Sequence, residues 1–550
     1  MAGTDDPSET GMLGQTTHRE DDGDAMGESV RDAATALADA IRTTLGPNGM
    51  DKMVVGENGS VIVTNDGSSI IEWMDIAHPV VRLVERVARA QDDTVGDGTT
   101  TTVVLAAALL DEATALRDKG LHPTTIVDGY VRAAETAIQE LEAYELSIES
   151  TQDTHLNHVA ETAVTGRWDD ASTERFADLT LAALRRIEFD TSKLTLKSYP
   201  GGELRESACL DGILVDLDSS STTLVGPGHD RLGSMTAPAI GMIDGEIGIA
   251  EPDHVESLEF ETAAQQAAYQ THERDRRESL VEGVRDAGTT VLFSQKAIDE
   301  SVRTTLLGHG VLPVERTRRD EFDVIARATG ATPVTAVDEL TPDDLGTVDA
   351  VEQRRAGTTE TLVLQGCPEE QRASLLLRGG TPHVADEVRR IIADCIDVTR
   401  LSLDDGALLP GGGAAPTALS MDLADAGRAI ADRDQLVFDG FASALEAIPR
   451  TLAENAGTDP LAVLATLKQR HDSGTPTVGI GPDGRPCEMV DAGVLEPAAV
   501  FRSALQRAVA VATMVLRVDD VVRVSSGDDG HEDHDHGHAA TGGYPWAVGH

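Results

Sequence analysis

The stretch TVGDGTTTT, residues 94–102, ends a polar segment and opens a predicted apolar helix over residues 103–116. Its two glycines let a ligand approach the backbone closely, and the free N–H groups at a helix start attract anions. Asp97 adds a carboxylate that can hold Mg²⁺ against phosphate oxygens, and the threonines add hydroxyl groups. The pattern indicates a nucleotide-phosphate site. A capped helix after a Gly/Asp turn accounts for the same letters, so the rest of the chain has to decide.

The composition is strongly acidic. Aspartate and glutamate number 95 against 45 lysines and arginines, which gives a formal charge of −50. Such a surface disfavours nucleic acid as a partner. It repels itself in dilute buffer, whereas at molar salt the Debye length falls to about 3 Å and the repulsion is screened. We therefore expect a halophilic protein, with a generic acidic cytosolic protein as the alternative.

At 550 residues the chain exceeds a single core and suggests about three domains. We expect a soluble, cytoplasmic protein without a membrane span, because no apolar run approaches ~20 residues and the N-terminus has no apolar signal segment. The four cysteines lie far apart and form no CxxC pair, which argues against a zinc site or a disulfide framework. They are Cys209, Cys367, Cys395 and Cys487.

Patterns along the chain predict a mixed α and β, multidomain fold. A helical stripe begins at Val30, a hairpin is expected over residues 53–64, and helices follow to about residue 144. Short strands and turns are frequent in residues 222–373, and helical segments return from residue 436. We therefore expect an all-α domain built from both ends of the chain, with an α/β domain inserted into it.

Four further features have more than one interpretation. Asp66 follows the hairpin either as a turn-former or as a carboxylate aimed at a site, and segment 249–271 is either a protrusion or a solvated loop. Asp394 lies beside the apolar stripe of a helix over residues 384–403, where a boundary carboxylate without chemistry is usual. Histidines after Gly527 suit metal binding or plain disorder. The stripe comprises Val384, Val388, Ile391, Ile392, Cys395 and Val398.

Seven short motifs occur in a fixed order: TTLGP (43–47), GMDKM (49–53), TNDG (64–67), GDGTT (96–100), GGG (411–413), LAENAG (452–457) and AGVLEP (492–497). Each is weak alone, but together their order and spacing are specific. With them the chain resembles the archaeal group II chaperonins, the thermosome family, from about residue 30 to residue 524.

The resemblance implies a three-domain subunit of a double ring that encloses a cavity. The implied domains are an equatorial ATP-binding domain (27–156 and 407–526), an intermediate domain (157–221 and 374–406) and an apical domain (222–373) that binds unfolded or partly folded protein. The apical domain would carry a helical lid protrusion near residues 249–271. The ends are expected to be a disordered acidic arm (1–26) and a flexible, His-rich tail (527–550).

The resemblance also implies a site for ATP and Mg²⁺. Asp97 matches the Mg²⁺ ligand, and Asp66 and Asp394 match the two carboxylates that position and activate the attacking water. Phosphoryl transfer to water mainly needs alignment, a metal that neutralises charge and a carboxylate near the nucleophile. The remaining implied nucleotide contacts are Leu45, Gly46, Pro47, Gly96, Gly98, Thr99, Thr100, Thr101, Gly412, Gly479 and Glu496.

The chain departs from the family pattern in places. Asn48 stands where lysine or arginine is common, and Arg167 replaces the usual nucleotide-sensing lysine, keeping the charge but not its point-like geometry. The leading hypothesis is an ATP-hydrolysing folding machine. The alternative is a ring-forming scaffold or holdase that binds nucleotide and unfolded chains without a full cycle. A small-molecule kinase would need P-loop or kinase signatures that this sequence lacks.

Overall fold

The computed structural model describes residues 23–56, 59, 61–74, 76, 78–148, 153–217, 234–248 and 262–518. The His-rich tail and most of the expected protrusion lie outside them. So does the expected N-terminal arm, except for its last residues. Helix α1 (Gly23–Ile41) already begins there, so the arm boundary predicted at residue 26 is wrong. The predicted mixed α and β content is confirmed. The expectation that the domain built from both chain ends is all-α is wrong, because short strands such as Lys52–Val55, Val61–Thr64 and Ala407–Pro410 lie within those residues.

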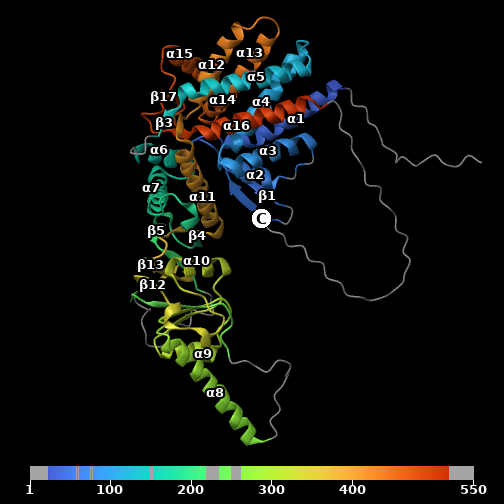
Figure 1. Cartoon of the computed structure of the whole chain (residues 1–550). Helices are drawn as coiled ribbons and strands as arrows, with labels where there is room; N and C mark the ends of the chain where they lie inside the picture. Colours follow the sequence, from blue (N-terminus) through green and yellow to red (C-terminus); the bar gives the residue numbers. More distant parts are fainter. Residues whose placement is uncertain are drawn as a thin grey trace, which may run out of the picture.

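The largest hydrophobic core joins helices from both ends of the chain (Figure 1). Helix α4 lies inside it and packs against α1, α3, α13 and α16. Its valines, leucines and alanines are buried around most of the helix, so α4 needs neighbours on several sides. The helices are α3 (Pro79–Val95), α4 (Thr99–Asp118), α5 (Pro123–Leu141), α12 (Ala414–Arg428), α13 (Asp434–Leu445), α14 (Ala447–Asn455), α15 (Pro460–Asp472) and α16 (Ala498–Leu516).

Two of these helices, α4 and α16, are long and apolar enough to cross a membrane by length and composition alone. The expectation that no apolar run approaches this length is therefore wrong. Both helices pack within the large core, where Leu105, Leu109 and Leu505 are almost completely buried. Helices that are apolar on most faces are also found in the interior of large soluble domains.

A hairpin leads to the first of the predicted carboxylates. Strands β1 (Lys52–Val55) and β2 (Val61–Thr64) pair antiparallel, as predicted. Asp66 then caps α2 (Gly67–Trp73), because its side chain accepts a hydrogen bond from the Ser69 N–H. The hairpin keeps several apolar side chains exposed, namely Met53, Val55, Val61 and Val63.

Two small sheets carry further site residues. In the first, β15 (Ala407–Pro410) lies between β3 (Leu146–Ser147) and β18 (Leu495–Pro497). In the second, β16 (Val478–Ile480) pairs with β17 (Pro486–Glu488). The short 3₁₀ turns among the described residues are Arg42–Thr44, Glu142–Tyr144, Thr191–Lys193, Leu204–Glu206, Val337–Glu339 and Pro342–Asp344.

A second core lies between α6 (Asp153–Val164), α7 (Asp170–Arg186), α11 (Pro382–Asp405) and a three-stranded sheet. In that sheet β14 (Ala373–Gly379) runs parallel to β4 (Leu194–Pro200) and antiparallel to β5 (Ala208–Asp211). The stripe predicted on α11 is buried except at Val384, which is 41% exposed. Its assignment to the buried stripe is wrong, because in this first helical turn the protein covers Ala385, which is 1% exposed, and leaves Val384 on the open side.

The remaining described residues form two four-stranded sheets with helices α8 (Ala263–Asp286), α9 (Glu300–Gly308) and α10 (Arg319–Thr329). Helix α8 begins with a capping box between Thr262 and Gln265 and extends away from the sheets (Figure 1). The first sheet contains β10 (Leu312–Val314), β9 (Val291–Ser294), β8 (Ala239–Ile243) and β11 (Gly346–Thr347), and the second β6 (Ile213–Asp216), β13 (Thr359–Gln365), β12 (Ala350–Ala356) and β7 (Met235–Thr236).

Candidate nucleotide site

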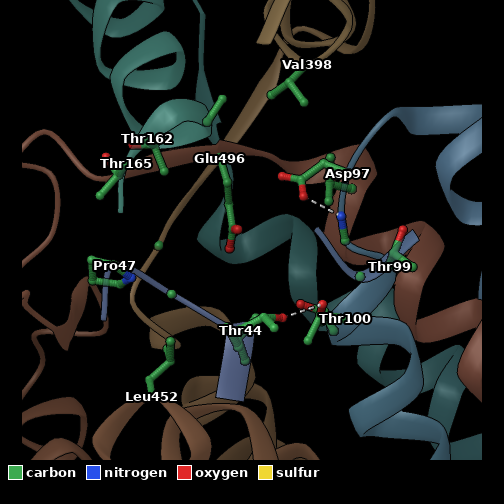
Figure 2. Close-up of a pocket in the computed structure, with 18 of the residues that line it drawn as sticks. Thr44, Pro47, Asp97, Thr99, Thr100, Thr162, Thr165, Val398, Leu452 and Glu496 are labelled. Atoms are coloured by element: carbon green, nitrogen blue, oxygen red, sulfur yellow. Dashed lines mark hydrogen bonds between the residues drawn. The ribbon is translucent and has the colours of Figure 1, made fainter. Parts of the chain in front are cut away.

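One cavity brings together nearly all the site residues predicted from the sequence. Figure 2 shows part of its lining, including Pro47, Asp97 and Glu496. The starts of α4 and α12 and one side of α11 contribute to its wall, so both the large helical core and the second core line it. The predicted residues in the lining are Leu45, Gly46, Pro47, Asp66, Gly96, Asp97, Gly98, Thr99, Thr100, Thr101, Asp394, Gly412 and Glu496.

The loop before α4 is shaped for an anionic ligand. Gly98 has a φ of 81° and forms the N-cap of α4, and no side chain caps the helix. The first N–H groups of α4 therefore remain available to a ligand. The buried Gln91 fixes the loop, because its Nε2 donates to the carbonyl oxygens of Asp97 (2.9 Å) and Val500 (3.2 Å).

A second glycine loop precedes α12 in a similar way. Gly413 is the N-cap of α12, again without a side-chain cap. Gly412 has a φ of 61°, and a Cβ there would lie 2.6 Å from Met489 Sδ. Gly479 packs behind this loop, since its own Cβ would lie 2.6 Å from the Gly411 carbonyl oxygen. Gly479 is not among the lining residues, so its predicted direct contact is corrected to a supporting position.

The loop at residues 44–47 forms another part of the wall. Asn455 fixes it by donating to the Leu45 carbonyl oxygen (2.8 Å), and the hydroxyl groups of Thr44 and Thr100 lie 3.3 Å apart (Figure 2). The next residue, Asn48, donates to the Pro482 carbonyl oxygen (2.8 Å). Asn48 thus ties this loop to the turn after β16, and it carries no charge for a ligand.

The Asp66 carboxylate is held in its ionised form. It accepts hydrogen bonds from Ser68 Oγ (2.6 Å) and the Ser69 N–H (2.7 Å), and Arg390 Nη1 lies 2.9 Å away. Burial raises the pKa of Asp66, but Arg390 and the two serines outweigh it, so the pKa lies below its ordinary value. An ionised carboxylate fixed by three donors is suited to orienting a water molecule.

The pKa of Asp394 is shifted in the opposite direction. Burial raises its pKa well above the ordinary value, and nearby Asp66, Asp92 and Asp97 raise it further, although Arg390 opposes the shift. A base works best when its pKa lies near the working pH. Of the two predicted catalytic carboxylates, Asp394 is therefore the one with the higher affinity for a proton.

Sequence reasoning missed several lining residues, including Asp92, Thr162 and Thr165. Burial raises the pKa of Asp92 to about 6, and the nearby charge of Asp66 contributes. Asp92 lies in the last turn of α3, one turn before the glycine that ends that helix. This position in the sequence could have identified Asp92 as a lining residue, because a carboxylate one helical turn before the glycine loop lies on the same side as the loop.

The cavity lining has more acidic than basic side chains. It contains five carboxylates and one guanidinium, that of Arg167, whose Nη1 is buried without a hydrogen-bond partner within the described ranges. The described residues form no cluster of three or more His, Cys, Asp or Glu that could hold a metal alone. Mg²⁺ typically binds through one or two carboxylates plus substrate phosphates. The accessible carboxylate of Asp97 fits that arrangement.

Comparison with known proteins gives the family. A model of the TCP-1/cpn60 chaperonin family matches residues 37–526. The chain is 36% identical over 520 residues to a thermosome subunit alpha of Halobacterium salinarum, covering 93% of this chain and 90% of the relative. It is 37% identical to a thermosome subunit alpha of Thermoplasma acidophilum (93% and 94%) and 36% identical to thermosome subunit 1 of Haloferax volcanii (96% and 94%). The chain belongs to the TCP-1/cpn60 chaperonin family.

The resemblance to archaeal group II chaperonins drawn from the seven motifs is thereby confirmed. Six of those motifs contribute to the cavity wall of this chaperonin or to the residues directly behind it. The LAENAG motif, for example, supplies Leu452 to the lining and Asn455 to the loop at residues 44–47. The motifs are therefore dispersed in sequence but adjacent in space.

Glu496 gives the site a pH dependence that can be measured without nucleotide. Burial raises its pKa to about 8 from an ordinary value of 4.5, and Asp97 adds to the rise. Between these values the folded chaperonin keeps a proton that the unfolded chain has lost. The stability contributed by Glu496 is therefore full below pH 4.5 and is lost as the pH rises towards 8.

We therefore expect the difference in free energy of unfolding between Glu496→Gln and the parent to change in favour of the variant as the pH rises from 5.5 to 8.5. The change should be on the order of 2 kcal/mol, after allowance for solvent that reaches the cavity wall. Urea unfolding in molar KCl with EDTA measures it. Glu135→Gln, on an exposed face of α5, is the matched control. A pH-independent difference for Glu496→Gln would contradict the assignment.

Proposed function

We propose that the protein is a subunit of an ATP-dependent chaperonin that binds unfolded protein and assists its folding inside a double-ring cavity, driven by ATP hydrolysis. The observation that carries the proposal is the convergence of Asp66, Asp97 and Asp394 on one cavity. They come from the cap of α2, the loop before α4 and the middle of α11, and therefore from two hydrophobic cores. Phosphoryl transfer to water needs such alignment of carboxylates around a phosphate.

The lining residues divide into binding and chemical roles. The N–H groups and hydroxyls of residues 98–101 and the loop at residues 45–47 would bind the phosphates, and Gly412 and Glu496 the nucleoside. Asp97 would hold Mg²⁺, which supplies charge neutralisation when bound. Asp66 would orient the attacking water and Asp394 would take its proton. Because Asp394 belongs to α11, its approach would depend on how the second core sits against the first.

We assign the domains on the same basis. The core shared by both chain ends supports an equatorial domain of residues 27–156 and 407–526, and the α6–α7–α11 core supports an intermediate domain of 157–221 and 374–406. Residues 222–373 would form the apical domain, with the exposed start of α8 as the described part of its protrusion. A cytoplasmic location is proposed with these assignments.

Ring assembly is proposed from the exposed hairpin. Met53 and Val55 of β1 are 70% and 62% exposed, and both edges of this two-stranded sheet lack further strands among the described residues. Apolar side chains on an unpaired sheet edge favour contact with another chain. We propose that other chaperonin subunits are that partner.

A ring-forming scaffold or holdase is the second candidate. Two observations favour it. Asn48 offers no charge to a nucleotide, and the described residues between 222 and 373 expose no large apolar side chain for an unfolded client. The two candidates differ in whether client release requires hydrolysis.

The proposal is tested by native mass measurement and client refolding in roughly 3 M KCl, repeated down to ~0.1 M. We expect a multi-subunit particle that refolds client with MgATP at high salt. We also expect the melting temperature to fall as salt is removed, because the repulsion of 95 acidic side chains is no longer screened. A monomer at high salt would contradict the chaperonin assignment. A melting temperature that does not change with salt concentration would contradict the halophilic assignment.

A further inference from the structure

Arg390 stands between the two predicted catalytic carboxylates. Its Nη1 lies 2.9 Å from Asp66 Oδ2 and 3.5 Å from Asp394 Oδ2. Asp66 caps α2, which packs in the large helical core, and Asp394 lies on α11 of the second core. The Arg390 guanidinium is therefore a direct polar link between the two cores. Without a cation there, two carboxylates that face one cavity would repel each other.

Two further groups fix the direction of the guanidinium. Its Nη2 donates to Glu387 Oε1 (2.6 Å) and to Thr64 Oγ1 (2.9 Å), and its Nε donates to Glu387 Oε2 (3.3 Å). Thr64 is itself almost completely buried at the end of β2, where it accepts from the Asp66 N–H (3.1 Å). Glu387 and Thr64 thus hold one side of the fork while the other side faces the carboxylates.

The spacing on α11 explains why this arrangement forms. Glu387, Arg390 and Asp394 are three and four residues apart, so they lie along one face of the helix. That face meets the end of β2 and the start of α2. Arginine suits this position better than lysine, because a planar guanidinium can donate to four acceptors in fixed directions, whereas a lysine ammonium is a single point charge.

We propose that Arg390 is a positioning residue for ATP hydrolysis, which holds Asp66 and Asp394 at a fixed separation and sets the orientation in which α11 presents Asp394 to the site. Arg390 is absent from the cavity lining, whereas Arg167 is part of it. The role of Arg390 is therefore exerted through the two carboxylates rather than on the nucleotide. The inference rests on the proposed hydrolysis site.

Arg390→Gln tests it through separate measurements of turnover and binding. We expect kcat to fall by roughly 10- to 100-fold while the ATP dissociation constant stays within about threefold of the parent. Arg390→Lys should recover only part of the loss. The matched control is Arg400→Gln. It breaks the exposed Arg400–Asp404 ion pair (3.1 Å), which lies nearer the C-terminal end of α11. Equal kcat in parent and Arg390→Gln, or a loss confined to ATP affinity, would overturn the proposal.

Glu387→Gln provides a second test should Arg390→Gln fold poorly. It weakens the anchor of the guanidinium, so we expect a smaller loss in kcat. The double variant, Glu387→Gln with Arg390→Gln, should hydrolyse ATP no more slowly than Arg390→Gln alone. The reason is that both changes disrupt the same Glu387–Arg390 interaction. Fully additive losses would overturn the proposal. Amide hydrogen exchange of residues 61–70 gives a readout without hydrolysis, and faster exchange in Arg390→Gln but not in Arg400→Gln is expected. A parent that does not hydrolyse ATP would instead refute the proposed function itself.

Discussion

Asp394→Ala is expected to slow single-turnover ATP hydrolysis by ~10²-fold or more while ATP binding stays close to that of the parent. Binding is retained because the phosphates would be held by the glycine loops and the start of α4, which the substitution leaves intact. Hydrolysis is expected to be lost because Asp394, whose pKa burial and neighbouring acids raise above its ordinary value, would no longer take the proton of the attacking water. Rapid-quench turnover, measured beside equilibrium binding in molar KCl, separates the two quantities.

Asp404→Ala is the control for this experiment, since Asp404 is an exposed carboxylate on the same helix. The same pair of proteins distinguishes the two candidate functions. In a hydrolysing chaperonin, Asp394→Ala should capture a client on addition of ATP and fail to release it. In a scaffold, capture would be equal in parent and variant, with or without ATP. Unchanged turnover in Asp394→Ala would remove it from the catalytic residues.

Asp97→Ala is expected to abolish the Mg²⁺ dependence of nucleotide binding. With saturating Mg²⁺ its affinity for ATP should fall by more than ~10-fold, because the protein ligand that the metal would share with the phosphates is gone. In EDTA the variant should bind ATP at least as tightly as the parent, because a negative charge has been removed from a cavity lined by five carboxylates. Titration calorimetry under both conditions measures the difference.

The control for this variant is Asp111→Ala, which removes one exposed carboxylate from α4, the helix that follows Asp97. It leaves the helix start unchanged and should bind MgATP like the parent. Retention of the full Mg²⁺ effect in Asp97→Ala would show that another group holds the metal. The assignment of Asp97 would then be withdrawn.

Local signals allowed much of the fold to be predicted. The hairpin before Asp66 and the helices on either side of the first glycine loop follow from periodicity, turn residues and helix caps, which act within a few residues. The stripe on α11 was predicted correctly except at Val384, because periodicity shows which face is apolar but not how far the neighbouring core extends. The apolar length of α4 and α16 was underestimated for a related reason, since scattered polar residues hid two helices that the large core surrounds.

The site was predictable where its residues are contiguous and less so where packing brings them together. Asp97 and the threonines after it belong to one motif, so their proximity is guaranteed by the chain. Asp66 and Asp394 are far apart in sequence, and their pairing came from the family resemblance. Asp92 and Arg390 were missed because their positions depend on how α3 and α11 pack. Gly479 was predicted to contact the nucleotide. A sequence motif does not distinguish a residue that contacts a ligand from one that packs behind the contacting loop.

The division of the large core between the two chain ends has a consequence for biosynthesis. Helix α4 leaves the ribosome long before α13 and α16, the partners that cover much of its apolar surface. At about 5–20 residues per second, roughly 20 to 75 s pass between the synthesis of α4 and that of α16. The two four-stranded sheets are encoded by one uninterrupted segment and can close in that interval. The cavity at the start of α4 can therefore close only after Val494, Glu496 and Val500, which line it, have been made. Until then the nascent chain exposes apolar surface of α4 that α13 and α16 later cover.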